Sequence, residues 1–405
     1  MKIIWQLFSV HIIVITIILI LLIAWLVWPR KFKTTRKALL ATNGFVLLCG
    51  LAMAMYTYWP RQYQKLYLNA PISAEIKSTP LRALADSIDF NIGVAISPGS
   101  NFKELIVTEF NSVVAENHFK PGYLMKDPGS WEFDFSSADE LIAFSRSNGL
   151  RIRGHTLIWG KFPGMTYPKE WISQINEASD KEQKMKALMT QYIETVMGHF
   201  KGQVPTWDVV NEPMGGEQLY PSIFTQSMGE EYIDLAFQLA RETDPSCTLF
   251  LNEQISYYDS PQAKAFLKLL ERLINRKVPI DGVGLQTHHI NQIHQLEGLK
   301  GYIREIGALG LTVEITELDI RLLLFDDEED PYKAQGQQFK EIVSICLNDP
   351  ACNGVTFWGL TDGANWMDAV PPFKWKSPNC PNLFDEDMVK KPAYVGVWEA
   401  LRAVQ

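Results

Sequence analysis

The sequence predicts an α/β fold, a (β/α)8 TIM barrel preceded by two transmembrane helices. Two observations predict it. Two long apolar runs without charge occupy the first 60 residues, and beyond them short β-rich runs alternate with amphipathic helical stretches. The predicted organisation is a membrane hairpin over residues 1–60, a linker over 61–80 and a barrel over 81–405.

The first predicted membrane helix covers residues 3–28, which contain no charged side chain. At about 1.5 Å per residue this run is longer than the roughly 30 Å hydrocarbon core of a bilayer. A cleaved signal peptide is the competing interpretation, but the apolar run is too long for one and no A-x-A-like site follows it. A second charge-free run predicts a helix over residues 38–59, and Trp and Tyr residues lie near the ends of both runs, as interfacial aromatics do.

The segment between the two runs, residues 29–37, carries five basic side chains. The positive-inside rule therefore places this loop in the cytoplasm and both chain termini outside it. We accordingly expect a multi-pass protein of the plasma (inner) membrane whose barrel lies on the extracytoplasmic side.

The charge of the chain is unevenly distributed. The chain has 38 basic and 46 acidic residues. Residues 1–60 contain six of the basic residues and no acidic one, so the remaining residues contain 32 basic and 46 acidic residues. Such an acidic body excludes a nucleic-acid partner, which needs a basic surface, and it argues against peripheral docking on anionic lipid. The sequence contains no metal-ligand cluster and implies no cofactor, and it identifies no protein partner.

Two of the five cysteines, Cys346 and Cys352, are six residues apart around an Asn-Asp-Pro turn. Two buried thiols are one interpretation. A disulfide closing a small loop is the other, and an oxidising extracytoplasmic compartment favours it.

The barrel prediction depends on runs rich in β-branched residues that are separated by helical stretches. The predicted strands are Asn91–Ile96, Asn111–Ala115, Arg151–Leu157, Val204–Val210, Thr248–Leu251, Ile280–Gln286, Thr312–Thr316 and Gly354–Trp358. Helical stretches between them include Lys181–His199, Met228–Thr243, Ser260–Arg276 and Tyr332–Cys346. Residues 60–80, with three prolines and no sustained periodicity, predict a tether. A doubly wound open sheet is the alternative, but the sequence has neither a G-x-G-x-x-G turn nor a P-loop.

Polar side chains follow several predicted strands at the point where each strand ends. Asn211 and Glu212 end one run, His288 another, Glu317 a third, and His155 lies at the end of a fourth. In a barrel these positions converge on the C-terminal face, where barrel enzymes build their active sites. Two carboxyl groups at one rim are what glycoside hydrolysis requires, one protonated to donate to the leaving oxygen and one ionised.

Six short motifs occur in an order that resembles glycoside hydrolase family 10, the retaining endo-β-1,4-xylanases. The resemblance covers residues 80–402, and its motifs are Glu116-Asn117 followed by Lys120, Gly154-His-Thr-Leu-Ile-Trp159, Trp207-Asp-Val-Val-Asn-Glu-Pro213, Gln286-Thr-His288, Ile315-Thr-Glu-Leu-Asp319 and Phe357-Trp-Gly-Leu-Thr-Asp362. The Cys346/Cys352 pair also falls where many members of the family carry a disulfide.

The resemblance implies a role for each matching residue. Glu212 is expected to be the acid/base and Glu317 the nucleophile. Asn211 is expected to contact the sugar 2-hydroxyl, and His288 to bond Glu317 with Asp319 as its orienting neighbour. The remaining residues are expected to contact the substrate. On the non-reducing side of the cleft these are Asn117, Lys120, His155, Trp159 and Gln286. Trp358 and Trp366 are expected to form the aromatic floor and wall of the cleft.

The segment Trp159-Gly-Lys-Phe-Pro163 departs from the family pattern. Members continue this motif with a second histidine and a glutamine, and here both are absent and the segment is one residue shorter. The segment Asn252-Glu-Gln-Ile255, also expected near the cleft, differs from the family pattern as well. The resemblance therefore implies intact catalysis with altered substrate recognition.

The sequence thus predicts a membrane-anchored endo-β-1,4-glycanase that acts on xylan or a related polysaccharide. One alternative is trimming of the cell's own exopolysaccharide during export. Another is a catalytically inactive glycan-binding membrane protein.

Overall fold

The computed structural model describes residues 72–99, 102–293, 295–373 and 379–405, all of which belong to one compact unit, Ile72–Gln405. The predicted membrane helices over residues 3–28 and 38–59, and the loop between them, lie outside these ranges. Within the ranges, no helix combines the length and the apolarity needed to cross a bilayer.

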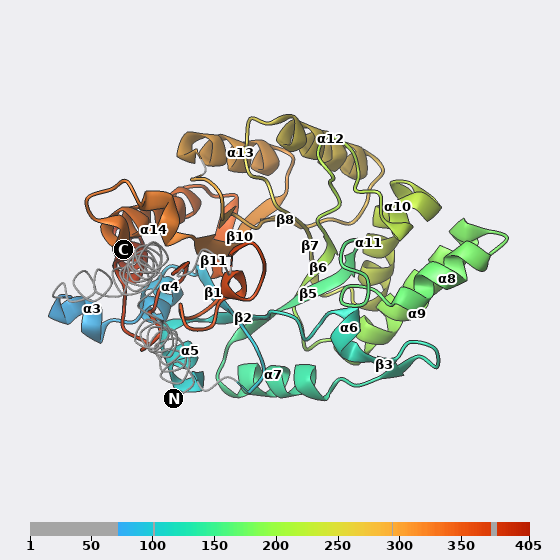
Figure 1. Ribbon diagram of the computed structural model, residues 1–405, viewed down its shortest axis with the longest axis horizontal. Helices are drawn as coiled ribbons and strands as arrows, with labels where there is room; N and C mark the ends of the chain where they lie inside the picture. Colours follow the sequence, from blue (N-terminus) through green and yellow to red (C-terminus); the bar gives the residue numbers. More distant parts are fainter. Residues whose placement is uncertain (1–71, 100–101, 294, 374–378) are drawn as a thin grey trace, which may run out of the picture. The chain divides into compact units, whose positions relative to one another are not determined.

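Eight parallel strands close into a barrel, which confirms the predicted (β/α)8 fold (Figure 1). β11 pairs with both β1 and β10, and this double pairing closes the ring. In ring order the strands are β1 (Asn91–Ile96), β2 (Ser112–Ala115), β5 (Arg151–Trp159), β6 (Thr206–Asn211), β7 (Thr248–Glu253), β8 (Gly282–Leu285), β10 (Thr312–Ile320) and β11 (Cys352–Phe357).

Helices surround the barrel on its outside (Figure 1). The longer ones are α7 (Ser136–Ser147), α9 (Lys181–His199), α11 (Glu231–Thr243), α12 (Pro261–Asn275), α13 (Leu296–Ala308), α14 (Pro331–Leu347) and α15 (Pro392–Arg402). The shorter elements are α3 (Ala74–Ser78), α4 (Leu81–Ser87), α5 (Lys103–Glu109), α6 (Pro121–Leu124), α8 (Lys169–Glu177), α10 (Ile223–Met228), the 3₁₀ turns η1 (Leu322–Phe325) and η2 (Trp366–Asp368), and the small strands β3 (Met125–Asp127), β4 (Glu132–Phe133) and β9 (His288–His289).

Local sequence signals explain where several helices begin. Asp180 caps α9 by accepting from the Gln183 N–H, and Ser260 caps α12 by accepting from the Ala263 N–H immediately before a proline at the first helical position. The predicted helix Met228–Thr243 is interrupted in the structure. Gly229, at φ 62°, ends α10 before α11 begins at Glu231, because a residue without a side chain adopts this left-handed conformation readily.

The sequence predicts an irregular tether over residues 61–80, of which the structure describes residues 72–80. In this part the chain is not irregular throughout. Residues 74–78 form α3, which Ser73 caps, and its Ile76 is buried in the core. A five-residue helix with one buried apolar side chain is too short to show a periodic pattern in the sequence.

The centre of the barrel holds a buried ion cluster. Arg153 of β5 bonds both carboxylate oxygens of Asp208 on β6 and donates to Glu314 on β10 at 2.8 Å. Asp208 also bonds the His155 Nδ1 at 2.9 Å. Because each buried charge has an opposite partner, the cluster fixes the relative positions of the strands that carry the C-terminal rim.

Outside the barrel, Cys346 and Cys352 form a disulfide that joins the end of α14 to the start of β11. Cys247 and Cys380 are buried and take part in no disulfide within the described part of the chain. The C-terminal helix is joined to the N-terminal part of the same unit by the Tyr394 hydroxyl, which donates to Glu109 of α5 at 2.7 Å.

Candidate active site

The two glutamates predicted as acid/base and nucleophile lie at the C-terminal rim. Glu212 directly follows β6, and Glu317 lies within β10. Glu212 has φ 49°, and Thr287, between Gln286 and His288, has φ 58°. Non-glycine residues are rarely held in this region of backbone space, and those that are cluster at functional sites.

A continuous hydrogen-bond network connects the two carboxylates. Gln286 Nε2 donates to Glu212 Oε1 at 3.0 Å and to Asn211 Oδ1 at 3.3 Å. Asn252 Nδ2 donates to the same Asn211 oxygen at 2.8 Å and to Glu317 Oε1 at 2.6 Å. Buried hydrogen-bond networks of this kind hold their members in one geometry, so the two acids keep a fixed relation to each other.

A glycine makes room for this network. A Cβ atom on Gly284 of β8 would lie 2.1 Å from Asn252 Oδ1, which is far inside van der Waals contact. The same Asn252 oxygen accepts from the Thr316 hydroxyl at 2.7 Å. Asn252 is thereby oriented with its amide nitrogen toward Glu317.

Glu317 is held as an anion by a chain of polar contacts. His288 contacts Glu317 Oε2 at 3.1 Å through Nε2 and Asp319 Oδ1 at 2.8 Å through Nδ1, and Trp366 Nε1 donates to the other Asp319 oxygen at 2.7 Å. Burial lowers the pKa of His288, but the charge of Asp319 and the bonds to both carboxylates raise it to about 10. Burial likewise raises the pKa of Glu317, but the bond from His288 and the charge of His155 bring it below its usual value.

Glu212 is held differently from Glu317. Its Oε2 accepts from Lys161 Nζ at 2.6 Å, while Oε1 accepts from Gln286. The Glu212 side chain remains 15% exposed, whereas that of Glu317 is 6% exposed. Glu212, the predicted acid/base, is therefore the more accessible of the two.

The predicted sugar-binding residues surround this pair. Lys120 donates to Asn117 Oδ1 at 2.9 Å, and its ammonium lies 5.0 Å from the centre of the Trp159 ring. Burial lowers the pKa of Lys120 to about 8, against the opposing charges of Glu317, Glu116 and Glu212. The Trp358 ring lies edge-on to His155 at 5.2 Å.

A pocket of about 390 Å³ adjoins the aromatic residues Trp358 and Trp366. Glu116 also lines it and accepts from the Ser97 hydroxyl at 3.3 Å. The pocket is lined mainly by apolar side chains with a few polar groups, as carbohydrate and small-molecule sites are.

Two buried donors beside the acids have no hydrogen-bond partner within the described part of the chain, Asn211 Nδ2 and Trp159 Nε1. Unpartnered buried donors are costly unless a ligand satisfies them. The Asn211 side-chain oxygen already accepts from Asn252 and Gln286. The Asn211 N–H₂ group therefore remains available to donate to a hydroxyl of a sugar ligand.

No role was predicted for three residues of the site, Asn252, Glu253 and Lys161, although the two segments that hold them were expected to differ from the family pattern. Asn252 and Glu253 end β7, so the rule that identified Glu212 and Glu317 by strand ends applies to them as well. Glu253 accepts from the Met214 and Gln254 N–H groups at 2.9 Å each. Lys161 lies in the segment that departs from the family pattern, but sequence gives no sign that it reaches Glu212.

Among the described residues, no group of three or more His, Cys, Asp or Glu side chains is arranged to hold a metal ion. The side chains at the rim offer one accessible carboxyl, that of Glu212, and one buried carboxylate, that of Glu317.

Replacing His288 with Asn is expected to move the pH dependence of activity. The nucleophile role predicted for Glu317 requires the ionised carboxylate, so activity should be lost as pH falls through the Glu317 pKa, and His288 lowers that pKa. Removing His288 raises the Glu317 pKa, and the acidic limb of the kcat/KM profile moves to higher pH. A hydrogen bond to a charged group contributes about 1.5–3 kcal/mol, so kcat/KM at neutral pH falls roughly 10- to 100-fold. A loss of activity without movement of the limb would contradict this role.

Comparison with known proteins gives one family. The model of glycosyl hydrolase family 10 matches residues 81–400. The chain is similar to endo-1,4-beta-xylanase B of Thermotoga neapolitana, with 31% identity over 80% of this chain and 92% of the relative. It is 33% identical to endo-1,4-beta-xylanase A of Cellvibrio japonicus, where the match spans 78% of this chain and 56% of that longer protein.

Solved structures are similar as well. Xylanase 10B of Thermotoga petrophila RKU-1 in complex with xylobiose superimposes with a TM-score of 0.72 and 27% identity, over 83% of this chain and 99% of that chain. Native xylanase 10B of Thermotoga maritima superimposes with a TM-score of 0.71 and 29% identity, over 80% of this chain and 98% of that chain.

Proposed function

We propose, since the chain belongs to glycosyl hydrolase family 10, that it is a retaining endo-β-1,4-xylanase that cleaves internal linkages of xylan through a covalent glycosyl-enzyme. The glycoside hydrolase assignment itself is given by the family and by its xylanase relatives at about 30% identity. The observation that carries the proposed reaction is the network through Gln286, Asn211 and Asn252 that holds Glu212 and Glu317 together.

In the first step the Glu212 carboxylic acid donates its proton to the glycosidic oxygen while Glu317 attacks the anomeric carbon. The bond between that carbon and the leaving oxygen breaks, and an ester bond to Glu317 forms. The buried His288 supports this step because it keeps Glu317 ionised before the attack. The free Asn211 N–H₂ lies beside both acids and donates to the sugar 2-hydroxyl, a contact that strengthens in the transition state.

In the second step Glu212, now a carboxylate, takes a proton from water as the water attacks the same carbon. Glu317 leaves as a carboxylate, and Glu212 regains the proton it gave. Two displacements at one carbon retain its configuration, so the product has the anomeric configuration of the substrate.

A polysaccharide panel tests the substrate. Full-length protein in detergent is incubated with linear xylan, β-1,4-glucan, mixed-linkage β-glucan and purified envelope polysaccharide, and the products are separated by size. We expect xylo-oligosaccharides of several lengths from xylan and a rate on xylan at least tenfold that on either glucan. Release of monosaccharide alone would contradict an endo mode of cleavage, and a preference for another polymer would contradict xylan as substrate.

We also propose that residues 1–60 anchor the enzyme in the plasma (inner) membrane with its barrel outside the cytoplasm. This proposal is supported by the two charge-free apolar runs and by the five basic residues between them. The protein should stay in the membrane fraction after alkaline carbonate washing, and added protease should digest the barrel on spheroplasts. Release by carbonate, or protection from protease, would contradict it.

The two alternatives drawn from the sequence have less support. The hydrogen-bonded pair of glutamates argues against an inactive glycan-binding barrel. No observation within the described residues favours the cell's own exopolysaccharide over xylan.

A further inference from the structure

Lys161 places a positive charge against the acid/base, and the hydrolysis proposed above does not use it. Its ammonium bonds Glu212 at 2.6 Å, with the two side chains 24% and 15% exposed. The backbone around Lys161 is held in place, because the Thr166 hydroxyl, itself buried, donates to the carbonyl oxygens of both Lys161 and Phe162. The ion pair is therefore built into the fold of this loop.

This ion pair opposes the first catalytic step. Glu212 must carry a proton when substrate is bound, yet both of its oxygens accept bonds from N–H donors, Lys161 on one side and Gln286 on the other. Only a protonated oxygen can donate to a leaving group, and here each oxygen of Glu212 is turned toward a donor of the protein. The contact between Lys161 and Glu212 must therefore open before Glu212 acts as an acid.

Among the described residues, Lys161 forms an ion pair with Glu212 alone. Glu253 is the neighbouring carboxyl, but it is fully buried and its oxygens accept from backbone N–H groups. Burial and the charge of Glu212 raise the pKa of Glu253 to about 8, so it is mainly uncharged at neutral pH. The Tyr220 ring, 5.2 Å from the ammonium, is the other contact and carries no full charge.

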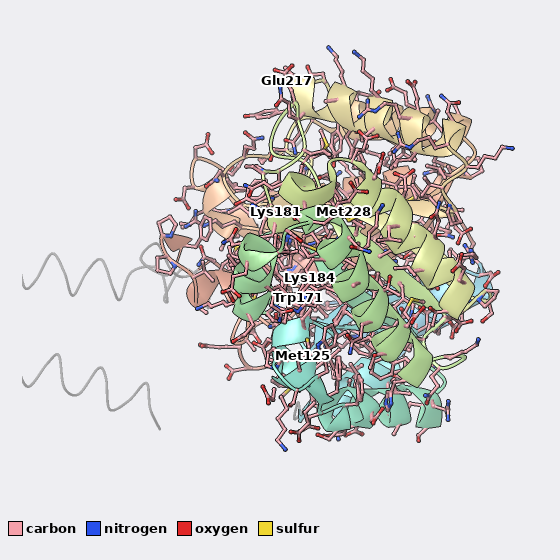
Figure 2. All side chains as sticks on the ribbon, turned by 90° about the vertical axis from the view of Figure 1, so that its right-hand side faces the viewer. Met125, Trp171, Lys181, Lys184, Glu217 and Met228 are labelled. Atoms are coloured by element: carbon pink, nitrogen blue, oxygen red, sulfur yellow. A yellow bond between two sulfur atoms is a disulfide. The ribbon has the colours of Figure 1, made fainter. Side chains whose placement is uncertain are left out.

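The loop after Glu212 leads from Lys161 to a second pocket. Residues 213–220 form a tight hairpin, in which Met214 pairs with Leu219 and Tyr220 donates to Pro213. Tyr220 contacts Lys161, while Met214 and Leu219 line a pocket of about 380 Å³ that reaches α12. Figure 2 shows Glu217 of this hairpin beside α12.

The charges in that pocket are mainly basic. Lys264 and Lys268, one turn apart on α12, line it and are exposed, and neither has an ion-pair partner within the described ranges. Arg272 is already paired with Glu230, and Glu217 is the one acidic residue of the lining. Such a basic surface is unexpected in a chain with eight more acidic than basic residues.

We propose that Lys161 is a specificity-determining residue that binds a carboxylate group on the leaving-group part of the substrate, so that the preferred substrate is a β-1,4-glycan bearing uronic acid. The substrate carboxylate replaces Glu212 as the partner of the Lys161 ammonium. Glu212, released, takes up a proton from solvent and then donates it to the glycosidic oxygen. This inference rests on the proposed hydrolysis and adds to it the charge of the substrate.

The test compares one polymer in two charge states. Xylan substituted with glucuronic acid is the acidic substrate, and the same preparation after carbodiimide activation and borohydride reduction of its carboxyl groups is the neutral one. The readout is the ratio of the two kcat/KM values for full-length wild type, Lys161→Gln, Lys161→Arg and the control Lys201→Gln. Lys201 is exposed and has no ion-pair partner among the described residues, so its replacement changes net charge equally.

Wild type and Lys201→Gln should favour the acidic polymer by roughly tenfold, the expected worth of one charge-assisted contact. Lys161→Gln should bring the ratio close to one, and Lys161→Arg should keep most of the preference. The shorter products from wild type should carry the uronic acid at their new non-reducing end, since that sugar belonged to the leaving group.

An equal rate on the two polymers by wild type would overturn the inference while leaving the proposed xylanase activity intact. A preference that survives Lys161→Gln would also overturn it, because the carboxylate would then be bound elsewhere. Failure to hydrolyse either polymer would instead contradict the proposed function itself.

Discussion

Glu317→Ala is expected to lower kcat on xylan by roughly 10⁴-fold or more, which is the scale of loss when a catalytic nucleophile is removed. The alanine has no oxygen with which to form the glycosyl-enzyme, so the first displacement cannot occur. His288 and Asn252 lose the carboxylate that they contact. The measurement is the initial rate of reducing-end release from xylan, with folding checked by circular dichroism.

Added azide provides a positive control for the Glu317→Ala variant. A small anion can occupy the space of the missing carboxylate and attack the anomeric carbon directly. With an aryl xylobioside, azide should restore turnover and give a glycosyl azide of inverted configuration. Activity on xylan within tenfold of wild type would contradict the role of Glu317.

Glu212→Ala is the second large effect, and its size should depend on the leaving group. Loss of a general acid costs about 10²- to 10⁴-fold. On xylan, whose leaving group is a sugar hydroxyl, we expect the upper end of this range. On a dinitrophenyl xylobioside the leaving group departs without protonation, so the step that forms the glycosyl-enzyme should be affected much less. The measurement is kcat/KM on both substrates.

Glu212→Gln is the matched variant for this experiment, since it keeps the shape of the side chain and the possible contact with Gln286. It also leaves Lys161 without its carboxylate partner. An equal loss on both substrates would contradict the acid role of Glu212 and would indicate that the residue acts in some other way.

The regular part of the fold was predictable because strong local patterns determine it. The predicted strand Asn91–Ile96 and helix Lys181–His199 coincide with β1 and α9, where burial pattern, capping and periodicity agree. β5 and β10 extend further than expected, to Trp159 and Ile320. The added residues of both strands continue to pair with neighbouring strands, and the sequence of one strand alone does not reveal such pairing.

The candidate site was predictable to the extent that strand ends reveal it. Glu212, Glu317 and His288 each end an apolar run, so their common position on the rim follows from the barrel alone. Asn252 obeys the same rule, but its contact with Glu317 depends on space left by Gly284 of the next strand. Lys161 could not be predicted, because its approach to Glu212 depends on how a shortened loop folds over the rim.

The chemistry of the nucleophile also depends on contacts that only the folded chain makes. Burial alone would leave Glu317 with a raised pKa, and His288 reverses that effect. His288 is charged because Asp319 faces its other nitrogen, with Trp366 orienting Asp319 in turn. The sequence motifs identify these residues, but the distances between their side chains and the direction of the resulting pKa shift cannot be derived from the motifs.

The most direct test of the central claim is to trap the covalent intermediate. A 2-deoxy-2-fluoro xylobioside with a dinitrophenyl leaving group forms the glycosyl-enzyme faster than water can break it down, and peptide mass spectrometry then locates the attached sugar. The label should be found on Glu317 in wild type and should be absent from Glu317→Ala. A label on another residue, or unimpaired turnover without any label, would contradict hydrolysis through a Glu317 ester.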